Sequence, residues 1–147
     1  MQVNLGCGHL SDEEFIVAFE SLNLKHAKFN HADHVRLAWI YVTRLGVAAA
    51  EEKLLLGIRR MAENVGAPQK FLYTTTVAWA RLVAAALEKD SRGANFEEWV
   101  ARHEALLDKN LLEAFYSEGV LKSEAARTGW VAPDRKVFGP TREDTAG

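Results

Sequence analysis

The sequence has a single cysteine, three prolines and no long run of apolar residues in its 147 positions. One cysteine, Cys7, excludes an internal disulfide and a cysteine-rich zinc site, and it is typical of a reducing compartment. No stretch reaches the roughly 18 uncharged apolar residues of a membrane-spanning helix. The first ten residues also lack the basic and apolar segments of a signal peptide. We therefore expect a cytoplasmic protein that neither is secreted nor spans a membrane.

An excess of charge of either sign is also lacking. The 18 Lys and Arg residues are offset by 20 Asp and Glu residues, which gives a formal net charge of −2. Because neutralising several phosphates requires a cationic surface, this balance argues against a nucleic-acid partner. The composition, with 48% hydrophobic and 26% charged residues, is typical of a globular chain, so we expect one compact domain over residues 1–147.

Most of the chain has the apolar spacing of amphipathic helices, and no strand alternation competes with it. Capping residues mark three helix starts, which are Ser11 with Glu14, Asn30 with Asp33, and Asn95 with Glu98. The predicted helices cover residues 11–23, 31–45, 48–65, 71–88, 96–103 and 108–115, with one or two further turns at 123–127. Gly119 is expected to break the sixth helix from those last turns.

The helical pattern ends after Gly129. We expect an extended C-terminal tail to be held over the core by its larger side chains, Trp130, Val131, Pro133 and Phe138. Residues 1–10 and 140–147 have little to bury and are expected to be flexible. The sequence thus predicts an all-α fold, a single compact bundle of about six helices with an extended C-terminal tail.

Two of the five histidines, His31 and His34, stand three residues apart at a predicted helix start. Residues at this spacing project from nearly the same helix face, here beside the inward-facing Val35 and Ala38. The positive end of the helix dipole lowers the pKa of an imidazole, and a neutral imidazole can act as a general base or a metal ligand. Equally, the pair could cap the helix or satisfy a buried polar contact.

A metal site would need a third ligand beside the two histidines. Their spacing differs from the His-Glu-x-x-His zinc signature, in which the histidines are four apart. The candidate third ligands are Asp33, His103, Glu104 and Asp108, and nothing in the sequence brings one of them into contact with the pair. We therefore predict neither a bound metal nor a cofactor.

A second polar cluster, Tyr73 to Thr76, places hydroxyl groups on a mostly apolar helix. Tyr73 and Thr76 share an edge with Val77 and Ala80, and a few polar groups among apolar walls are typical of a small-molecule pocket. Alternatively, the hydroxyls bond the preceding turn of their own helix. Most aromatic residues are expected in the core, and the predicted substrate-binding residues are Trp39, Thr76, Trp79 and Tyr116.

The segment Phe29-x-His31-x-x-His34-x-x-x-Ala38-Trp39 resembles a group of small bacterial all-helical proteins. The resemblance continues through residues 71–79 and 106–134 and covers most of the chain. In that group an aromatic-His-Glu-Thr-x-Thr motif follows, which implies a third histidine and a glutamate near the first pair. This chain has Leu72 and Tyr73 at those places. The absence of this histidine and glutamate implies a lost or altered metal site. The phenol of Tyr73 in their place suits metal-free proton transfer.

These observations favour a small cofactor-free enzyme of bacterial specialised metabolism. The expected reaction is an acid/base isomerisation, cyclisation or condensation of an apolar or aromatic small molecule. His31 and His34 would serve as base and orienting partner, and Tyr73 would donate a hydrogen bond or proton. The alternatives are a His-metal-dependent enzyme and a non-catalytic ligand-binding or interaction protein. The only partner expected is the small-molecule substrate, and a homodimer is left open.

Overall fold

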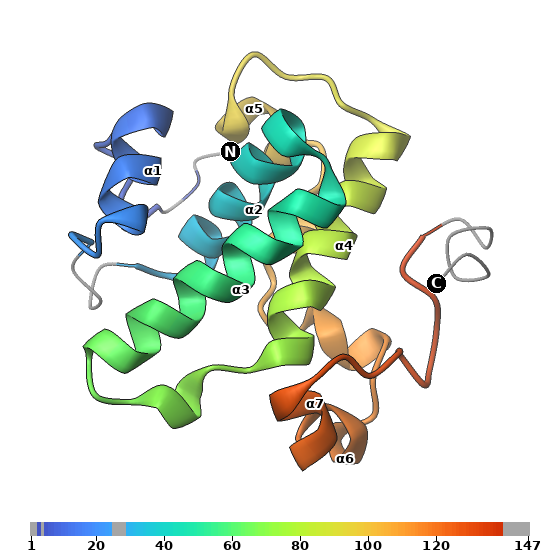
Figure 1. Cartoon of the computed structure of the whole chain (residues 1–147). Coiled ribbons are helices and arrows are strands. Elements are labelled where there is room, and N and C mark those ends of the chain that lie inside the picture. The colour runs from blue at the N-terminus through green and yellow to red at the C-terminus, as the bar shows by residue number, and fades with distance from the viewer. Residues whose placement is uncertain (1–2, 4, 25–28, 140–147) are drawn as a thin grey trace.

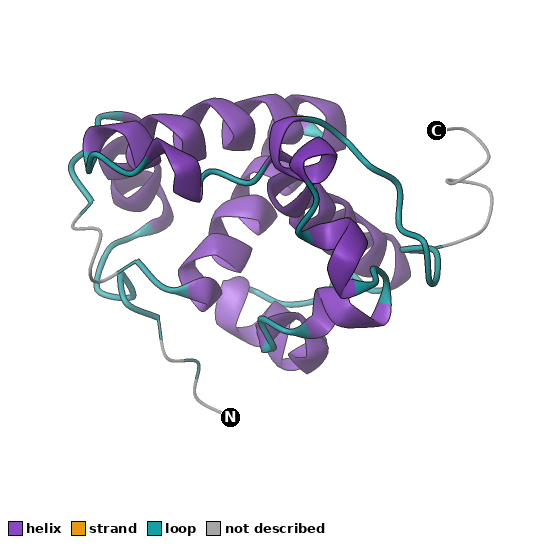
Figure 2. Ribbon diagram, turned by 90° about the horizontal axis from the view of Figure 1, so that it is seen from below, coloured by secondary structure: helices purple, strands orange, loops and turns teal. Residues whose placement is uncertain are grey.

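A computed structural model of the chain describes residues 3, 5–24 and 29–139 (Figure 1). Within these residues all regular elements are helices and no strand is present, so the all-α class is confirmed (Figure 2). The α-helices are α1 (Asp12–Glu20), α2 (His31–Leu45), α3 (Val47–Asn64), α4 (Tyr73–Lys89), α5 (Phe96–Ala101), α6 (Glu118–Leu121) and α7 (Glu124–Thr128). None of them is long and apolar enough to cross a bilayer. Residues 140–147, for which flexibility was predicted, lie outside the described residues.

The three long helices α2, α3 and α4 pack against one another and form the centre of the fold (Figure 1). Their facing sides contribute fully buried apolar residues, including Val35 and Ala38 from α2, Leu54 from α3, and Ala78 and Val83 from α4. Val35 and Ala38 face inward as the apolar spacing of α2 predicted, whereas Leu37 and Ile40 are buried as well and Leu45 at the end of the helix is exposed. The shorter helices surround this three-helix centre.

The first two helices start with capping boxes, of which the sequence predicted the one at Ser11 and, at Asn30, a helix start with an acidic residue in its first turn. The Ser11 hydroxyl accepts from the Glu14 amide, and the Glu14 carboxylate accepts from the Ser11 amide. Asn30 and Asp33 exchange the same two hydrogen bonds at the start of α2, at 3.0 and 2.9 Å. Each box satisfies two backbone amides that a helix start leaves without partners.

The last third of the chain departs from the predicted helices. α5 already ends at Ala101, and the 3₁₀-helix η3 (Glu104–Leu107) follows it. The helix expected over 108–115 is wrong, because the Asp108 carboxylate accepts from the Asn110 amide in a turn and the 3₁₀-helix η4 (Leu111–Ala114) comes next. Gly119 lies inside α6 instead of breaking a helix. The described residues therefore form seven α-helices, several of them only one turn long.

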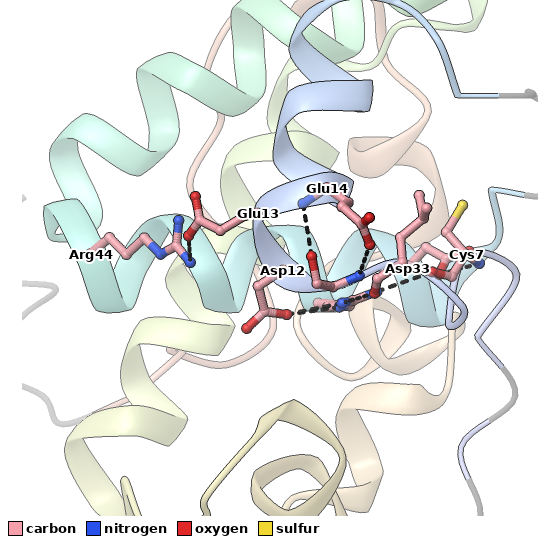
Figure 3. A network of polar contacts seen from close by, with 9 residues as sticks. Cys7, Asp12, Glu13, Glu14, Asp33 and Arg44 are labelled. Carbon is pink, nitrogen blue, oxygen red and sulfur yellow. Dashed lines mark hydrogen bonds and ion pairs between the residues drawn. The ribbon is translucent and has the colours of Figure 1, made fainter.

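Residues 5–10 are attached to α2, whereas a flexible segment was expected over residues 1–10, of which residues 1, 2 and 4 lie outside the described residues. The Cys7 amide donates to Asp33 at 3.1 Å, and the Arg36 guanidinium donates to the carbonyls of Cys7 and Leu10 at 3.2 and 2.8 Å. Arg36 also pairs with Asp12 at the start of α1, at 2.9 Å. Figure 3 shows Cys7, Asp12 and Asp33 in this network. Because Asp33 and Arg36 are buried, these bonds are needed to compensate the loss of hydration.

The C-terminal tail, residues 129–139, lies over the core as predicted. The Thr74 hydroxyl donates to the Gly129 carbonyl at 2.6 Å and accepts from the Val131 amide at 2.9 Å. The Tyr116 hydroxyl donates to the Val131 carbonyl at 2.6 Å. Phe138 packs on Tyr116, with ring centroids 6.0 Å apart. The tail is thus held at both ends and forms part of the surface above α4.

Candidate functional site

His31 is held in one orientation by two elements that are distant in sequence. Its Nε2 atom lies 2.9 Å from the carbonyl oxygen of Leu106 in η3. Its ring meets Trp79 of α4 edge-on, with centroids 4.5 Å apart and an interplanar angle of 64°. Because a carbonyl oxygen can only accept, Nε2 carries the proton in this bond and Nδ1 is the basic nitrogen of the neutral ring.

His34 lies beside His31 in the first turn of α2, and its Nε2 atom is fully buried. No hydrogen-bond partner for this nitrogen is found in the part of the chain that the structure describes. Its ring centroid lies 6.3 Å from that of Phe29. Buried polar atoms without a partner are rare in native proteins, so this nitrogen is a candidate contact for a bound molecule.

Burial keeps both imidazoles neutral near pH 7. Loss of hydration, with a smaller effect of the neighbouring His31, lowers the pKa of His34 to about 4. Loss of hydration also lowers the pKa of His31, although the Leu106 carbonyl and the nearby Asp108 partly oppose it. The pKa values of both histidines are lowered, as the sequence predicted, but the cause is burial instead of the helix dipole.

The two hydroxyl residues predicted from α4 do not join the histidine pair. The Thr76 hydroxyl donates to the Leu72 carbonyl in the preceding turn at 2.8 Å. This is the bond that the alternative interpretation of the sequence predicted for these hydroxyls. The Tyr73 ring packs edge-on against Phe71, with centroids 6.5 Å apart. Among the described residues, no hydrogen bond or ring contact connects Tyr73 with His31.

The predicted aromatic residues are distributed over different parts of the fold. Trp39 packs on Phe96 and Trp99 of α5, with ring centroids 5.6 and 6.3 Å away. Tyr116 is buried and bonded to the tail. Of the four predicted substrate-binding residues, Trp79 is the one whose ring contacts the histidine pair.

Three of the four candidate third metal ligands, Asp33, His103 and Asp108, have other partners. Within the described residues, no group of three or more His, Cys, Asp and Glu side chains could hold a metal ion. Asp33 caps α2 and accepts from the Cys7 amide. Nε2 of His103 bonds the Asp90 carbonyl at 2.9 Å, and Asp108 closes its own turn.

A groove of about 800 Å³ runs along the second half of α4, where η3 and the tail cover the helix. Its walls include Leu82 and Ala86 of α4, Leu106 of η3, and Phe138 of the tail. Leu106 therefore lines this groove, named here the α4 groove, while its carbonyl holds His31. The volume lies within the range of small-molecule sites.

Sequence reasoning missed the α4 groove because three segments far apart in the chain build it. His103 lines the groove, but the sequence indicated it only as a potential metal ligand. The one available signal was the apolar tail, whose Phe138 was expected over the core but without a location on it.

Comparisons of the chain with protein-family models, with curated proteins and with solved structures find no match. The resemblance to the bacterial helical group around His31 and His34 therefore stays a prediction. Any function assigned to this chain rests on the geometry and chemistry of its own residues.

Proposed function

We propose that this protein is a small enzyme that catalyses an acid/base isomerisation, cyclisation or condensation of an apolar or aromatic small molecule. The observation that carries the proposal is the hydrogen bond from Nε2 of His31 to the Leu106 carbonyl. It orients the ring and leaves Nδ1 as the basic nitrogen, as a general base requires. Burial lowers the pKa of His31 and so favours the neutral imidazole, although the bond to the Leu106 carbonyl partly opposes this shift.

His34 would position the substrate next to this base. Its buried Nε2 atom has no partner among the described residues, and an unsatisfied buried polar group costs about 1–3 kcal/mol. A substrate hydroxyl or carbonyl that bonds this nitrogen would remove that cost. With a pKa of about 4, His34 remains neutral and serves better as a hydrogen-bonding group than as the base.

In the proposed reaction, Nδ1 of His31 removes a proton from the substrate, and the resulting imidazolium returns it at another position. The proton balance closes within the site, so an isomerisation or cyclisation consumes no further reagent. The sequence predicted that Tyr73 donates a hydrogen bond or proton to the substrate. Its ring packs on Phe71, however, and among the described residues no contact joins it to the histidine pair. His31 is therefore both base and acid in this proposal.

The α4 groove supplies a place for the apolar part of the substrate. Leu106 connects the groove with His31, because the residue lines the groove and its carbonyl binds the imidazole. Walls such as Leu82, Ala86 and Phe138 would exclude water from an apolar or aromatic body.

The base can be tested with 5-nitrobenzisoxazole, an aromatic compound whose ring opens to a coloured phenolate when a base removes one proton. We expect the protein to accelerate this reaction over free imidazole at equal concentration, and His31→Gln to lower the rate roughly 10²-fold. His9→Gln, at an exposed position outside α2, is the matched control. Equal rates for wild type and His31→Gln would overturn the assignment of the base.

A second candidate function is ligand binding without catalysis, which the α4 groove favours independently of the histidines. In that case His31 serves only to join α2 to η3 and α4. His31→Gln and His34→Gln would then melt several degrees lower than wild type and leave the rate with 5-nitrobenzisoxazole unchanged. Thermal melts measured beside the rates separate the two functions.

A further inference from the structure

The apolar wall of the α4 groove is rigidly supported. Leu82 and Leu106 are buried and belong to the core of the protein. Phe138, on the tail side, packs on Phe115 and Tyr116 with centroids 5.0 and 6.0 Å away. A ligand would therefore meet a preformed surface suited to an alkyl or aryl body.

One end of the groove carries a cationic group without an ion pair. Lys89, in the last turn of α4, lines the groove and is exposed, and no salt bridge to it is found within the described residues. Glu88 also lines the groove, but this carboxylate already has an interaction partner. The neighbouring Asp90 is paired with Arg92 and Arg102, at 3.0 and 2.7 Å, so its charge does not compete for Lys89.

His103 adds a second polar group at the same end. Its Nε2 atom bonds the Asp90 carbonyl at 2.9 Å, and its ring packs on Trp99 with centroids 4.7 Å apart. Because the carbonyl accepts, Nε2 carries the proton, and Nδ1 is left for a ligand. In the neutral ring this nitrogen can only accept a hydrogen bond, so the charge of an anionic head group is placed at Lys89.

We infer that the α4 groove binds an amphipathic carboxylic acid, with its apolar body on Leu82, Leu106 and Phe138 and its carboxylate at Lys89. The claim that such an acid is also the substrate rests on the proposed function. The claim that it binds does not, because the groove residues are separate from the histidine pair. A cationic head group would be repelled by the ammonium of Lys89, and a neutral one would lose the charge interaction.

Three probes that share a naphthalene ring and differ in head group test the inference: 1-naphthaleneacetate, 1-naphthaleneethanol and 1-naphthaleneethylamine. Each is titrated into the full-length protein while the backbone amide signals of Ala86 and Leu106 are followed by NMR. We expect shifts at both amides and affinities that decrease from the anion to the alcohol to the amine. Equal affinities, or shifts confined to other parts of the protein, would overturn the inference.

Variants separate the head-group contact from the apolar contact. Lys89→Gln should weaken binding of the acid roughly two- to fivefold, as expected for an exposed ion pair, and leave the alcohol unaffected. Lys70→Gln, at an exposed lysine of the 3₁₀-helix η2 (Pro68–Lys70) that does not line the groove, is the matched control. Ala86→Phe should abolish binding of all three probes by filling the groove. Unchanged binding of the acid to Lys89→Gln would refute the assigned head-group site.

The variant His31→Gln separates acid binding in the α4 groove from the proposed catalytic function. His31→Gln should bind 1-naphthaleneacetate as wild type does while losing the rate with 5-nitrobenzisoxazole. Acid binding combined with an unchanged rate in His31→Gln would refute the proposed base and support the groove. A lost rate in that variant combined with no acid binding to wild type would refute the groove and support the base.

Discussion

Burial of the His34 imidazole leads to a quantitative prediction about pH and stability. Its pKa falls from the ordinary value of 6.5 to about 4 in the folded chain. Between these two pH values the unfolded chain holds a proton on this residue that the folded chain does not. The free energy of unfolding therefore contains a contribution that is fully present above pH 6.5 and is lost as the pH falls towards 4.

The size of this contribution follows from the two pKa values. At about 1.36 kcal/mol per pH unit, the interval from 6.5 to about 4 corresponds to on the order of 3 kcal/mol. Lowering the pH from about 7.5 to about 5 covers only part of this interval and should cost about 2 kcal/mol through His34. Losses of this size are a large fraction of the stability of a small domain.

Urea denaturation at the two pH values measures the effect. Wild type should lose about 2 kcal/mol more than His34→Gln on acidification, because glutamine cannot take up the proton. His9→Gln, which replaces an exposed histidine with glutamine, is the matched control for the substitution itself. An equal loss in wild type and His34→Gln would refute the argument that burial holds this imidazole neutral.

Three further substitutions test the packing around the site. Gly57→Ala places a Cβ atom that would meet the Phe19 ring and should destabilise by roughly 1–3 kcal/mol in urea denaturation, although alanine favours a helix. Thr74→Val removes both bonds to the tail and should cost about 1–3 kcal/mol, and limited trypsin digestion should cut the freed tail faster. Arg36→Ala removes the donor to the Cys7 and Leu10 carbonyls and to the partly exposed Asp12, so thermal melts should show a loss of about 2 kcal/mol or more.

Local features of this chain were predictable because they depend on residues within a few positions. The capping boxes at Ser11 and Asn30 need only a side chain three residues away, and both are present in the structure. The inward placement of Val35 and Ala38 in α2 follows from its apolar spacing, and the burial of both residues confirms it. The closeness of His31 and His34 has the same origin, since three residues make almost one helical turn.

Segments near the minimum length of a helix were predicted less well. Between Ala101 and Thr128 the two 3₁₀-helices η3 and η4 are followed by the two short α-helices α6 and α7. Isolated helices of this length are unstable in water, so tertiary contacts decide which turns form and where they end. Asp108 illustrates the difficulty, because a carboxylate at that position suits a helix cap and a turn equally well, and it closes a turn.

The partners of the polar residues were decided only by the packing of distant segments. Arg36 is buried because the N-terminal segment brings carbonyls from 26 and 29 positions away to its guanidinium. His31 has a defined tautomer because Leu106, 75 positions away, presents its carbonyl to the ring. The α4 groove exists only because the tail crosses α4 next to η3. Apolar periodicity determines which face of each helix turns inward, but it carries no information on which other segment that face will meet.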